Sequence, residues 1–466
     1  MAIIEQHQLL ENLKEGIKKA QFLSESVLVS YSKQIEFIDP LVFYRNGEIL
    51  YKGSRIYWSD VEDVTMVGLG SAVVQAYNGE ERFEKIEEYW RKVITGAVIH
   101  REVDVKGTGP VCMGGFSFDP VQMKTRLWKD FPDANFTVPN WLLTVKGNQC
   151  FLSINASVNE HMDPCTIESQ LIDLEMQLLK NNTIPTPSQG ESLMVEENQI
   201  NEWLAMVHKS IDAINKGEME KVVLSRTTTV TANKTFDQSS VLLALQERQS
   251  DCYTFAFEKG TSTFVGSTPE RLIKKAGGKF NTMCLAGTIS RGQTAEEDQK
   301  LGETLLSDPK NRDEHQMVVT MISDAMGKVC DKIVKSDSPQ IYKSKDVQHL
   351  YTPIKGETKR ELSLLSVVKA LHPTPAMGGV PTEKAIEAIR ERETYERGWY
   401  SAPIGWFDED GDGEFVVAIR SGLITKENAV LFSGCGIVAD SDPQSEYLET
   451  KIKFTPMLTA LGGGWE

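Results

Sequence analysis

Charged side chains and glycines gather near the C-terminal end of the chain, in residues 415–453. An apolar strand pattern carries Arg420, a turn follows at 426–428, and a second apolar run ends at Gly434 and Gly436. A cation and a bare backbone are therefore expected side by side, and glycine lets a ligand approach the backbone closely. The pattern predicts a binding site for an anion.

A helix is expected directly after these strands, with its capping residue and a first-turn proline within 441–443. Spacings of three and four residues place Glu446, Glu449 and Lys453 on one face of that helix. Such spacing is ordinary on a water-facing helix, but here it follows the glycine pair. Two carboxylates beside an anion site predict that a hard metal ion binds there as well.

A further carboxylate, Glu314, lies near the start of a helix predicted from about Asp313 to Val334. Glu314 falls on the same side as an apolar stripe that is expected to be buried: Met317, Val318, Met321, Ile322, Ala325, Met326, Val329 and Ile333. A buried carboxylate needs a cation or several donors, so metal binding and simple capping of the helix both stay open. Because all candidate ligands are oxygens, Mg²⁺ is the expected ion.

Two residues are candidates for proton transfer. Lys221 opens a strand pattern, where a lysine is usually a solvated end or guards an edge against aggregation. Glu270 follows Pro269 inside a series of strands, and proline there marks an edge or bulge that can aim a side chain into a cleft. The alternative for Glu270 is a surface carboxylate. His349 stands alone in a strand-like run and is expected to be a hydrogen-bonded structural residue.

Composition excludes several classes of partner. The 466 residues carry 50 Lys and Arg against 66 Asp and Glu, a net charge of −16, which disfavours nucleic acid and anionic lipid. Seven scattered cysteines without a CxxC pair indicate reduced thiols. The N-terminal residues lack a signal-peptide core, and no apolar run is long enough to span a bilayer. We therefore expect a cytoplasmic protein that binds neither nucleic acid nor membrane.

The remaining patterns predict a mixed α/β chain. Helices are expected at 5–24 and 81–97, strands lie between and after them, and residues 286–288 are expected to end a strand with an open backbone. Residues 181–192 are rich in proline and polar side chains, which suits either a linker or a surface loop.

This segment divides the chain into an N-terminal scaffold half, 1–190, and a catalytic region, 191–466, expected to form one integrated domain. Two look-alike motifs are rejected. Residues 68–70 lack the third glycine of a dinucleotide loop, and the acidic run at 408–413 has isoleucine, not glutamate, at the twelfth position of a calcium loop.

Nine segments occur in the order typical of one enzyme family: KVVLSR (221–226), GSTPERL (266–272), AGT (286–288), NRDEH (311–315), VQHL (347–350), HPTPA (372–376), RGWYSAPIGW (397–406), VAIRSGL (417–423) and GCGIVADSDPQSEYLETKIK (434–453). Together they resemble the chorismate-utilising enzymes, which include isochorismate, salicylate and anthranilate synthases. The resemblance covers roughly residues 195–455. The segments at 31–41 and 114–119 look like the menaquinone-pathway isochorismate synthases.

The resemblance implies an α/β (α+β) fold like that of anthranilate synthase component I, with two large, mainly antiparallel sheets flanked by helices and the site in a cleft. It also implies Mg²⁺ at Glu314 and Glu449, with Glu446 in or next to the ligand shell. The residues implied to bind chorismate are Gly287, Thr288, His349, Ala376, Tyr400, Arg420, Gly434, Gly436 and Lys453.

The implied reaction adds water at C2 of chorismate, expels the C4 hydroxyl and shifts the double bond. Lys221 resembles the family's general base and Glu270 its general acid. A lysine acts as a base only when its pKa is lowered, and hydroxide leaves poorly without a proton donor. Members that add ammonia carry glutamine at the position of Lys221, and aminodeoxychorismate synthases carry lysine at the position of Ala286, so we expect an isomerase, an isochorismate synthase of menaquinone biosynthesis.

Three alternatives stay open at this point. A salicylate synthase would use the same site and then eliminate pyruvate, although the loop at 372–379 resembles the isochorismate type. An isochorismate synthase could instead serve a siderophore pathway. A regulatory subunit could bind chorismate without catalysis, but such a module has no need for both Lys221 and Glu270.

Overall fold

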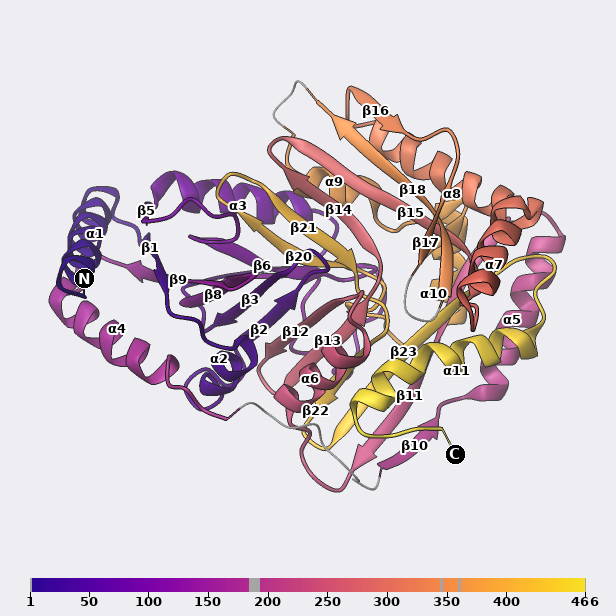
Figure 1. Cartoon of the computed structure of the whole chain (residues 1–466), viewed down its shortest axis with the longest axis horizontal. Coiled ribbons are helices and arrows are strands. Elements are labelled where there is room, and N and C mark those ends of the chain that lie inside the picture. The colour runs from indigo at the N-terminus through magenta and orange to yellow at the C-terminus, as the bar shows by residue number, and fades with distance from the viewer. Residues whose placement is uncertain (1, 184–192, 344–346, 359–361, 466) are drawn as a thin grey trace.

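Two large β-sheets run through the molecule and helices cover their outer faces (Figure 1). The structure, a computed structural model, describes residues 2–183, 193–343, 347–358 and 362–465. In these ranges one sheet has 13 strands and the other has ten, and all pairings are antiparallel except that of β1 with β5. The predicted α/β fold with two large, mainly antiparallel sheets is confirmed.

The larger sheet follows the order β10-β11-β23-β22-β13-β12-β2-β3-β8-β9-β1-β5, with β19 added beside β11. Its strands are β1 (Val27–Ile35), β2 (Arg55–Ser59), β3 (Val64–Leu69), β5 (Val98–Arg101), β8 (Trp141–Lys146), β9 (Gln149–Val158), β10 (Leu193–Glu197), β11 (Lys221–Ala232), β12 (Tyr253–Lys259), β13 (Ser262–Thr268), β19 (Gly379–Val380), β22 (Ser421–Thr425) and β23 (Asn428–Ile437).

The smaller sheet follows the order β16-β18-β15-β14-β21-β20-β6-β7-β4, with β17 added beside β18. Its strands are β4 (Val73–Tyr77), β6 (Val111–Phe116), β7 (Ala134–Val138), β14 (Arg271–Ala276), β15 (Lys279–Ser290), β16 (Lys332–Lys335), β17 (Gln340–Lys343), β18 (Val347–Glu357), β20 (Pro403–Asp408) and β21 (Gly413–Val417).

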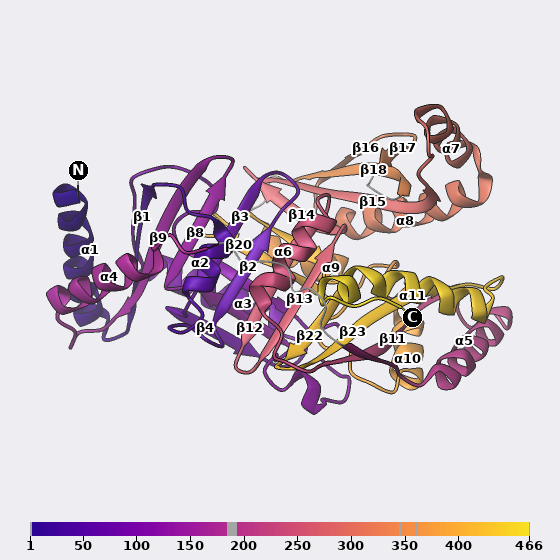
Figure 2. The ribbon, with the colours of Figure 1, turned by 60° about the horizontal axis from the view of Figure 1, so that its bottom comes forward.

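Helices occupy both ends and the flanks of this pair of sheets, with α1 and α4 at one end and α5 and α7 at the other (Figure 2). They are α1 (Ala2–Leu23), α2 (Pro40–Asn46), α3 (Arg82–Gly96), α4 (Pro164–Leu178), α5 (Ile200–Asn215), α6 (Gln238–Arg248), α7 (Ala295–Ser307), α8 (Pro309–Gly327), α9 (Leu364–Leu371), α10 (Thr382–Arg392) and α11 (Pro443–Ala460). No helix in the described ranges has both the length and the apolar character needed to cross a bilayer.

The core lies where the sheets face each other. An aromatic cluster there takes side chains from strands of both sheets and from the loop between β6 and β7; its large members include Trp58, Trp128, Phe255, Phe257, Phe264, Trp399 and Trp406. Burial of such rings is the main stabilising contribution here, at about 25 cal/mol per Å² of apolar surface. A second cluster lies under α1, α2, α6 and α11.

Both halves of the sequence contribute to both sheets. In the larger sheet β12 pairs with β2, and in the smaller one β20 pairs with β6. Most of the segment that could be a linker, residues 184–192, lies outside the described residues. Since sheet hydrogen bonds cross from one half to the other, we propose that 1–190 and 191–466 form one integrated domain.

The long helix predicted from Asp313 to Val334 is wrong at both ends. Helix α8 begins at Pro309, where Asp308 caps it, and ends at Gly327. The following residues turn and enter β16, which pairs with β18. Val329 and Ile333 kept the helical spacing of apolar residues, but pairing with a sheet edge overrode that local pattern.

Candidate active site

The site lies where the chain crosses twice between the two sheets. Residues Pro269 and Glu270 lead from β13 in the larger sheet to β14 in the smaller one, and residues 418–420 lead from β21 back to β22. The crossings hydrogen-bond to each other: Val417 N donates to Glu270 O at 3.0 Å. The prediction that one strand would carry Arg420 into the next turn is therefore wrong, because the strand breaks just before it.

Arg420 has a φ of 50°, in the left-handed region that residues other than glycine rarely adopt. Ser267 N donates to Arg420 O at 3.2 Å, which ties this turn to the end of β13. A strained backbone persists only where its surroundings hold it, and such positions concentrate at functional sites. The charge of Arg420 lies close enough to Glu270 and Tyr400 to act on both groups, and its effect is to lower the pKa of each.

Glu270 is a partly buried carboxyl close to several cations. Burial raises the pKa of Glu270 from 4.5 to about 7, although Arg420, Lys453 and Lys221 all act to lower it. Near neutral pH the side chain therefore exists in both the protonated and the ionised form. This is the property required of a group that donates a proton and later recovers it.

The glycines at 434 and 436 make room for two functional side chains. They lie on β23, which pairs with β11. A Cβ at Gly436 would lie 2.7 Å from Cε of Lys221, and a Cβ at Gly434 would lie 3.2 Å from Oη of Tyr400. The glycines thus do more than expose backbone to a ligand, because they also let Lys221 and Tyr400 reach across the strand.

Cys435, between these glycines, is buried and its thiol donates to Glu446 O on α11 at 3.8 Å. Its side chain therefore faces the helix that covers β23. Asp442 caps α11 and Pro443 occupies its first turn, which confirms the predicted helix start.

Lys453 on α11 joins this helix to the glycine strand. Its ammonium donates to Gly434 O at 3.1 Å and also pairs with Glu449. The carboxylate of Glu449 is 50% exposed, so water can reach it. Helix α11 carries Glu446, Glu449 and Lys453 at spacings of three and four, which is the helix expected there, and Glu449 and Lys453 contact each other.

Glu314 on α8 faces Lys221, with 3.5 Å between its Oε1 and the lysine Nζ. The side chain of Glu314 is 50% exposed and Met317, one turn on, is 43% exposed. The prediction that Glu314 points into the core is therefore wrong, and the buried face of α8 runs through Val318, Ile322 and Met326.

The three glutamates do not form a closed ligand cage. Among the residues that the structure describes, no three His, Cys, Asp or Glu side chains are arranged to hold a metal ion. Glu314 and Glu449 are instead each paired with a lysine. Their donors are nonetheless all oxygen and open to water, which suits Mg²⁺ because that ion keeps several waters of its own.

A bulge in β15 forms another wall of the site. Gly287 has a φ of +79°, and the pairing with β18 shifts register there before the strand continues to Ser290. The expectation that residues 286–288 end the strand is wrong, because the extra residue is absorbed as a bulge. Beyond it, Thr288 Oγ1 and His349 Nδ1 lie 2.9 Å apart, and burial lowers the pKa of His349, which favours the neutral imidazole.

Tyr400 and Ala376 complete the set of predicted residues. The ring of Tyr400 stacks on Phe432 with centroids 5.2 Å apart, and burial raises its pKa to about 12, so the phenol keeps its proton and can donate to an anion. Ala376 borders a small cavity that Glu270 also lines. The structure thus brings the predicted residues to one region, around Glu270 and Arg420.

Sequence reasoning missed a buried ion pair that holds this region together. Arg397 pairs with Glu393 at 2.5 Å and neither side chain is exposed. Arg397 also donates to Val223 O at 2.7 Å, and Glu393 accepts hydrogen bonds from the amide and hydroxyl of Ser225. The two residues are four apart, a spacing that gave no sign of their burial.

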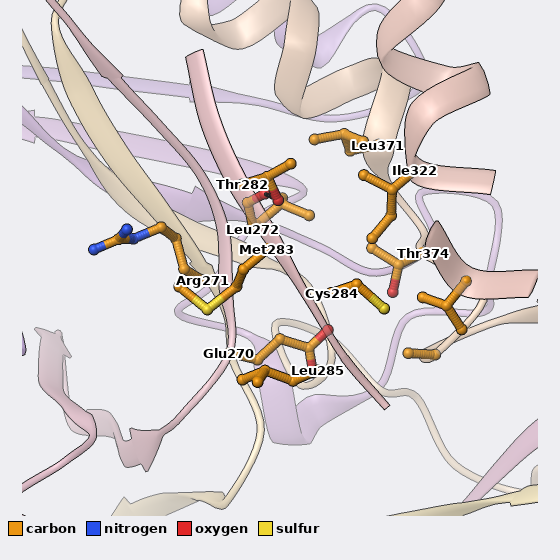
Figure 3. A pocket seen from close by; sticks show the side chains of 12 residues that line it. Glu270, Arg271, Leu272, Thr282, Met283, Cys284, Leu285, Ile322, Leu371 and Thr374 are labelled. Carbon is orange, nitrogen blue, oxygen red and sulfur yellow. Dashed lines mark hydrogen bonds between the residues drawn. The ribbon is translucent and has the colours of Figure 1, made fainter. Parts of the chain in front are cut away.

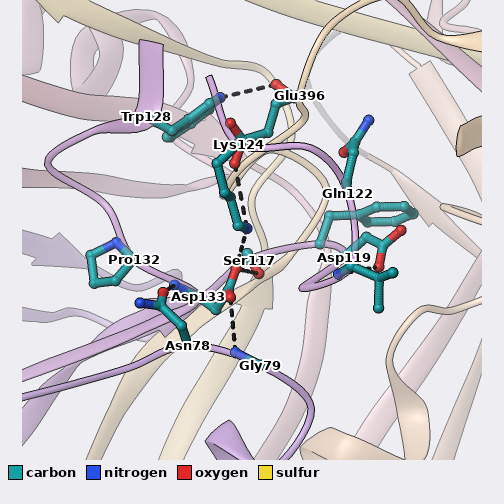
Figure 4. A network of polar contacts seen from close by, with 12 residues as sticks. Asn78, Gly79, Ser117, Asp119, Gln122, Lys124, Trp128, Pro132, Asp133 and Glu396 are labelled. Carbon is teal, nitrogen blue, oxygen red and sulfur yellow. Dashed lines mark hydrogen bonds and ion pairs between the residues drawn. The ribbon is translucent and has the colours of Figure 1, made fainter. Parts of the chain in front are cut away.

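The N-terminal half braces the segment that carries Tyr400. Trp128 Nε1 donates to Glu396 O at 3.0 Å, Phe118 N donates to Gly398 O at 2.7 Å, and Trp399 Nε1 donates to Pro132 O at 2.9 Å. Within residues 117–133, the carboxylate of Asp133 accepts hydrogen bonds from Lys124 and Ser117, and it also accepts one from Gly79 N outside this loop (Figure 4). Residues 117–133 thus fix the position of residues 395–400.

The chain belongs to the chorismate binding enzyme family, whose sequence profile, described as "Chorismate binding enzyme", matches residues 15–462. Isochorismate synthase MenF of Bacillus subtilis (strain 168) is 41% identical over 467 residues, which cover 98% of each chain. The salicylate biosynthesis isochorismate synthase of Pseudomonas aeruginosa is 34% identical, over 98% of this chain and 95% of that protein.

Solved structures show the same fold. MenF, the menaquinone-specific isochorismate synthase from Escherichia coli, superposes with a TM-score of 0.79 at 22% identity, over 98% of this chain and 100% of that one. Anthranilate synthase component I from Streptococcus pneumoniae superposes with a TM-score of 0.70 at 21% identity, over 85% and 92% of the two chains. The predicted family and fold are confirmed.

We predict that Arg397→Met destabilises the protein by about 3 to 5 kcal/mol, because it leaves the buried charge of Glu393 without a partner. Adding Glu393→Gln to that variant should recover part of the loss, since a neutral amide oxygen still accepts from Ser225. Urea unfolding followed by tryptophan fluorescence measures this. Lys384→Ala, which breaks an exposed pair with Glu387, is the control and should barely move the midpoint; an equal effect in both variants would contradict the argument.

We predict that Glu270→Gln stabilises the folded state in alkaline solution. The pKa of Glu270 is higher in the folded state, about 7, than its ordinary 4.5, so the cost of its buried charge is fully present above pH 7 and is lost as pH falls toward 4.5. The gain should reach up to about 3 kcal/mol at pH 8.5 and shrink toward zero near pH 5. Glu202→Gln, on the exposed face of α5, should show no such trend, and a pH-independent difference for Glu270→Gln would rule the assignment out.

Proposed function

We propose that the protein is an isochorismate synthase, an isomerase that converts chorismate to isochorismate. The observation that carries the proposal is the pair of Lys221 and Glu270 close to Arg420 and Lys453, with the pKa of the Glu270 carboxyl raised. The chain is also 41% identical to an isochorismate synthase over 98% of its length. A lysine at position 221 fits members that add water rather than ammonia. The names of the relatives favour menaquinone biosynthesis, and we place the enzyme in the cytoplasm, where its seven free cysteines would stay reduced.

The cations account for binding of a dianionic substrate. Arg420, the Tyr400 phenol and the backbone at Gly434 and Gly436 suit the pyruvyl carboxylate. Lys453, with the backbone and hydroxyl at the 287–288 bulge, suits the carboxylate on the ring. A charge-assisted hydrogen bond is stronger than a neutral one, so this set orients the ring as well as holding it.

The chemistry then needs one base and one acid. Lys221 takes a proton from the water that attacks C2, and Glu270 gives a proton to the C4 hydroxyl, which leaves as water while the double bond shifts. One water is consumed and one is released, so no other reactant is required. A donor whose pKa lies near the working pH is the most effective, which matches Glu270.

We propose Mg²⁺ as the cofactor, held by Glu314 and Glu449 with Glu446 in or beside the ligand shell. When bound, the ion neutralises the ring carboxylate of the substrate. Lys221 and Lys453 pair with Glu314 and Glu449 in this structure, so these contacts would have to open for the two glutamates to hold the ion, which would free the lysines for substrate and water. Arg420 and Glu270 need no such change.

A second candidate is a salicylate synthase, because one relative is the salicylate biosynthesis isochorismate synthase of Pseudomonas aeruginosa. That name describes an isochorismate synthase whose product is used further, so the first candidate fits it equally. Incubating the enzyme with chorismate and Mg²⁺ separates the two. We expect chromatography to show isochorismate without an equivalent amount of pyruvate. Release of one pyruvate for each molecule of salicylate formed would favour the second candidate.

We predict that Lys221→Ala and Glu270→Ala each lower turnover of chorismate by about a hundred- to ten-thousand-fold, because each removes one proton-transfer group. Chorismate binding, followed by calorimetry, should persist in both. The exposed residues Lys209 and Glu202 on α5 supply matched alanine controls with normal turnover. Normal activity in either site variant would remove the role assigned to that residue.

We predict that a chelator abolishes activity and that added Mg²⁺ restores it. Glu449→Gln and Glu314→Gln should each raise the Mg²⁺ concentration needed for half-maximal activity and weaken Mg²⁺ binding measured by calorimetry, because each loses a charged oxygen ligand. Glu202→Gln should leave both values unchanged. Full activity in the presence of excess chelator would overturn the metal assignment.

A further inference from the structure

A small cavity borders Glu270 between strands β14 and β15 on one side and helices α8 and α9 on the other (Figure 3). Its walls also include Val318 and Ile322 of α8, Leu371 of α9, and Thr374 and Ala376 from the loop that follows. The free volume is about 20 Å³, enough for one water molecule. The predicted substrate-binding residues other than Ala376 do not line this cavity, so it is separate from the anion-binding cations.

One polar group in the cavity wall has no partner. Thr374 Oγ1 is buried and makes no hydrogen bond to any residue that the structure describes. The other hydroxyl, of Thr282, already donates to Leu272 O at 2.7 Å, and the thiol of Cys284 lies 3.6 Å from His315 Nδ1. Glu270 and Thr374 both line the cavity, and in the view of Figure 3 the Cys284 thiol lies between the Thr374 hydroxyl and the Glu270 carboxyl.

A buried hydroxyl without a partner is unfavourable, and a polar cavity of this size commonly holds an ordered water that satisfies such groups. We propose that one internal water molecule bridges Thr374 Oγ1 and the carboxyl of Glu270, and that Thr374 is a positioning residue for the acid step. The inference rests on the proposed function, in which Glu270 donates a proton to the leaving hydroxyl.

The bridge acts when Glu270 becomes charged. Transfer of its proton to the C4 hydroxyl releases water and leaves a carboxylate, while Lys221 holds the proton taken from the attacking water. The bridging water then donates a hydrogen bond to the carboxylate, and Thr374 fixes its orientation. The cycle closes when Lys221 loses its proton and Glu270 regains one, so no net proton is consumed.

The cations near Glu270 lie outside the cavity, and the titratable groups that line the cavity are neutral or directed elsewhere. The bridging water is therefore the donor to the carboxylate on the cavity side. Arg420, Lys453 and Lys221 approach from the crossing, from α11 and from β11. On the cavity side, burial raises the pKa of Cys284 to about 12, so its thiol is neutral. Arg271 lines the cavity through its carbon chain, while its guanidinium is directed away to Glu414 and Glu62.

The test is Thr374→Val, which keeps the shape of the side chain and removes the hydroxyl. Loss of a donor to the carboxylate should raise the pKa of Glu270, so the alkaline limb of the pH profile of kcat should move up by about one unit. At pH 7, kcat should fall severalfold with KM almost unchanged, because the larger protonated fraction of Glu270 offsets part of the loss in its acid strength. Thr374→Ser should behave like the wild type, and Thr282→Val, whose hydroxyl serves only the backbone, should leave the limb in place.

Infrared difference spectroscopy of the carboxyl C=O stretch gives a second readout that needs no activity, with Glu270→Gln identifying the band. The pKa of Glu270 should rise by about one unit in Thr374→Val and by a smaller amount in Thr374→Ala, which carries the test should the valine variant not fold. An unshifted pKa in these variants overturns the inference. A wild type that forms no isochorismate would refute the proposed function alone, because the infrared titration would still decide the role of Thr374.

Discussion

The ion pair between Arg397 and Glu393 is the constraint on which the site depends. Both side chains are removed from water, which is costly unless every charge and donor is satisfied. Their partners are backbone groups of β11 and of the loop after Ala376, so the pair fixes where these segments meet. The position of Lys221 relative to Tyr400 is thus set in the core of the protein rather than by surface loops.

The second feature is a balance of opposing effects at Glu270. Burial favours the neutral acid, and three nearby cations favour the carboxylate, so neither form dominates strongly at neutral pH. This balance exists because the chain changes sheets at Glu270 and again at Arg420, with hydrogen bonds between the two crossings. A fold with two sheets therefore supplies what a single sheet would not: an interior position at a change of sheet, which charged side chains from the second crossing, from β11 and from α11 can approach.

Local signals predicted the parts of this structure that local forces determine. Helix α11 begins at the capping residue and first-turn proline expected within 441–443, and the turn expected at 426–428 joins β22 to β23. The changes of sheet, the exposure of Glu314 and the burial of Arg397 depend on which distant residues lie nearby, and periodicity along the chain contains no such information. The motifs identified which residues gather, but only the tertiary structure showed that Lys221 and Tyr400 occupy the spaces left by glycines.

The bracing of residues 395–400 by the loop at 117–133 has a consequence for engineering. The backbone contacts made by Trp128, Phe118 and Trp399 connect a part of the chain that holds neither of the two predicted catalytic residues to the part that holds both. Recombining the front portion of one relative with the rear portion of another would separate these partners. Successful hybrids should therefore exchange the loop and the segment it supports as a single cassette.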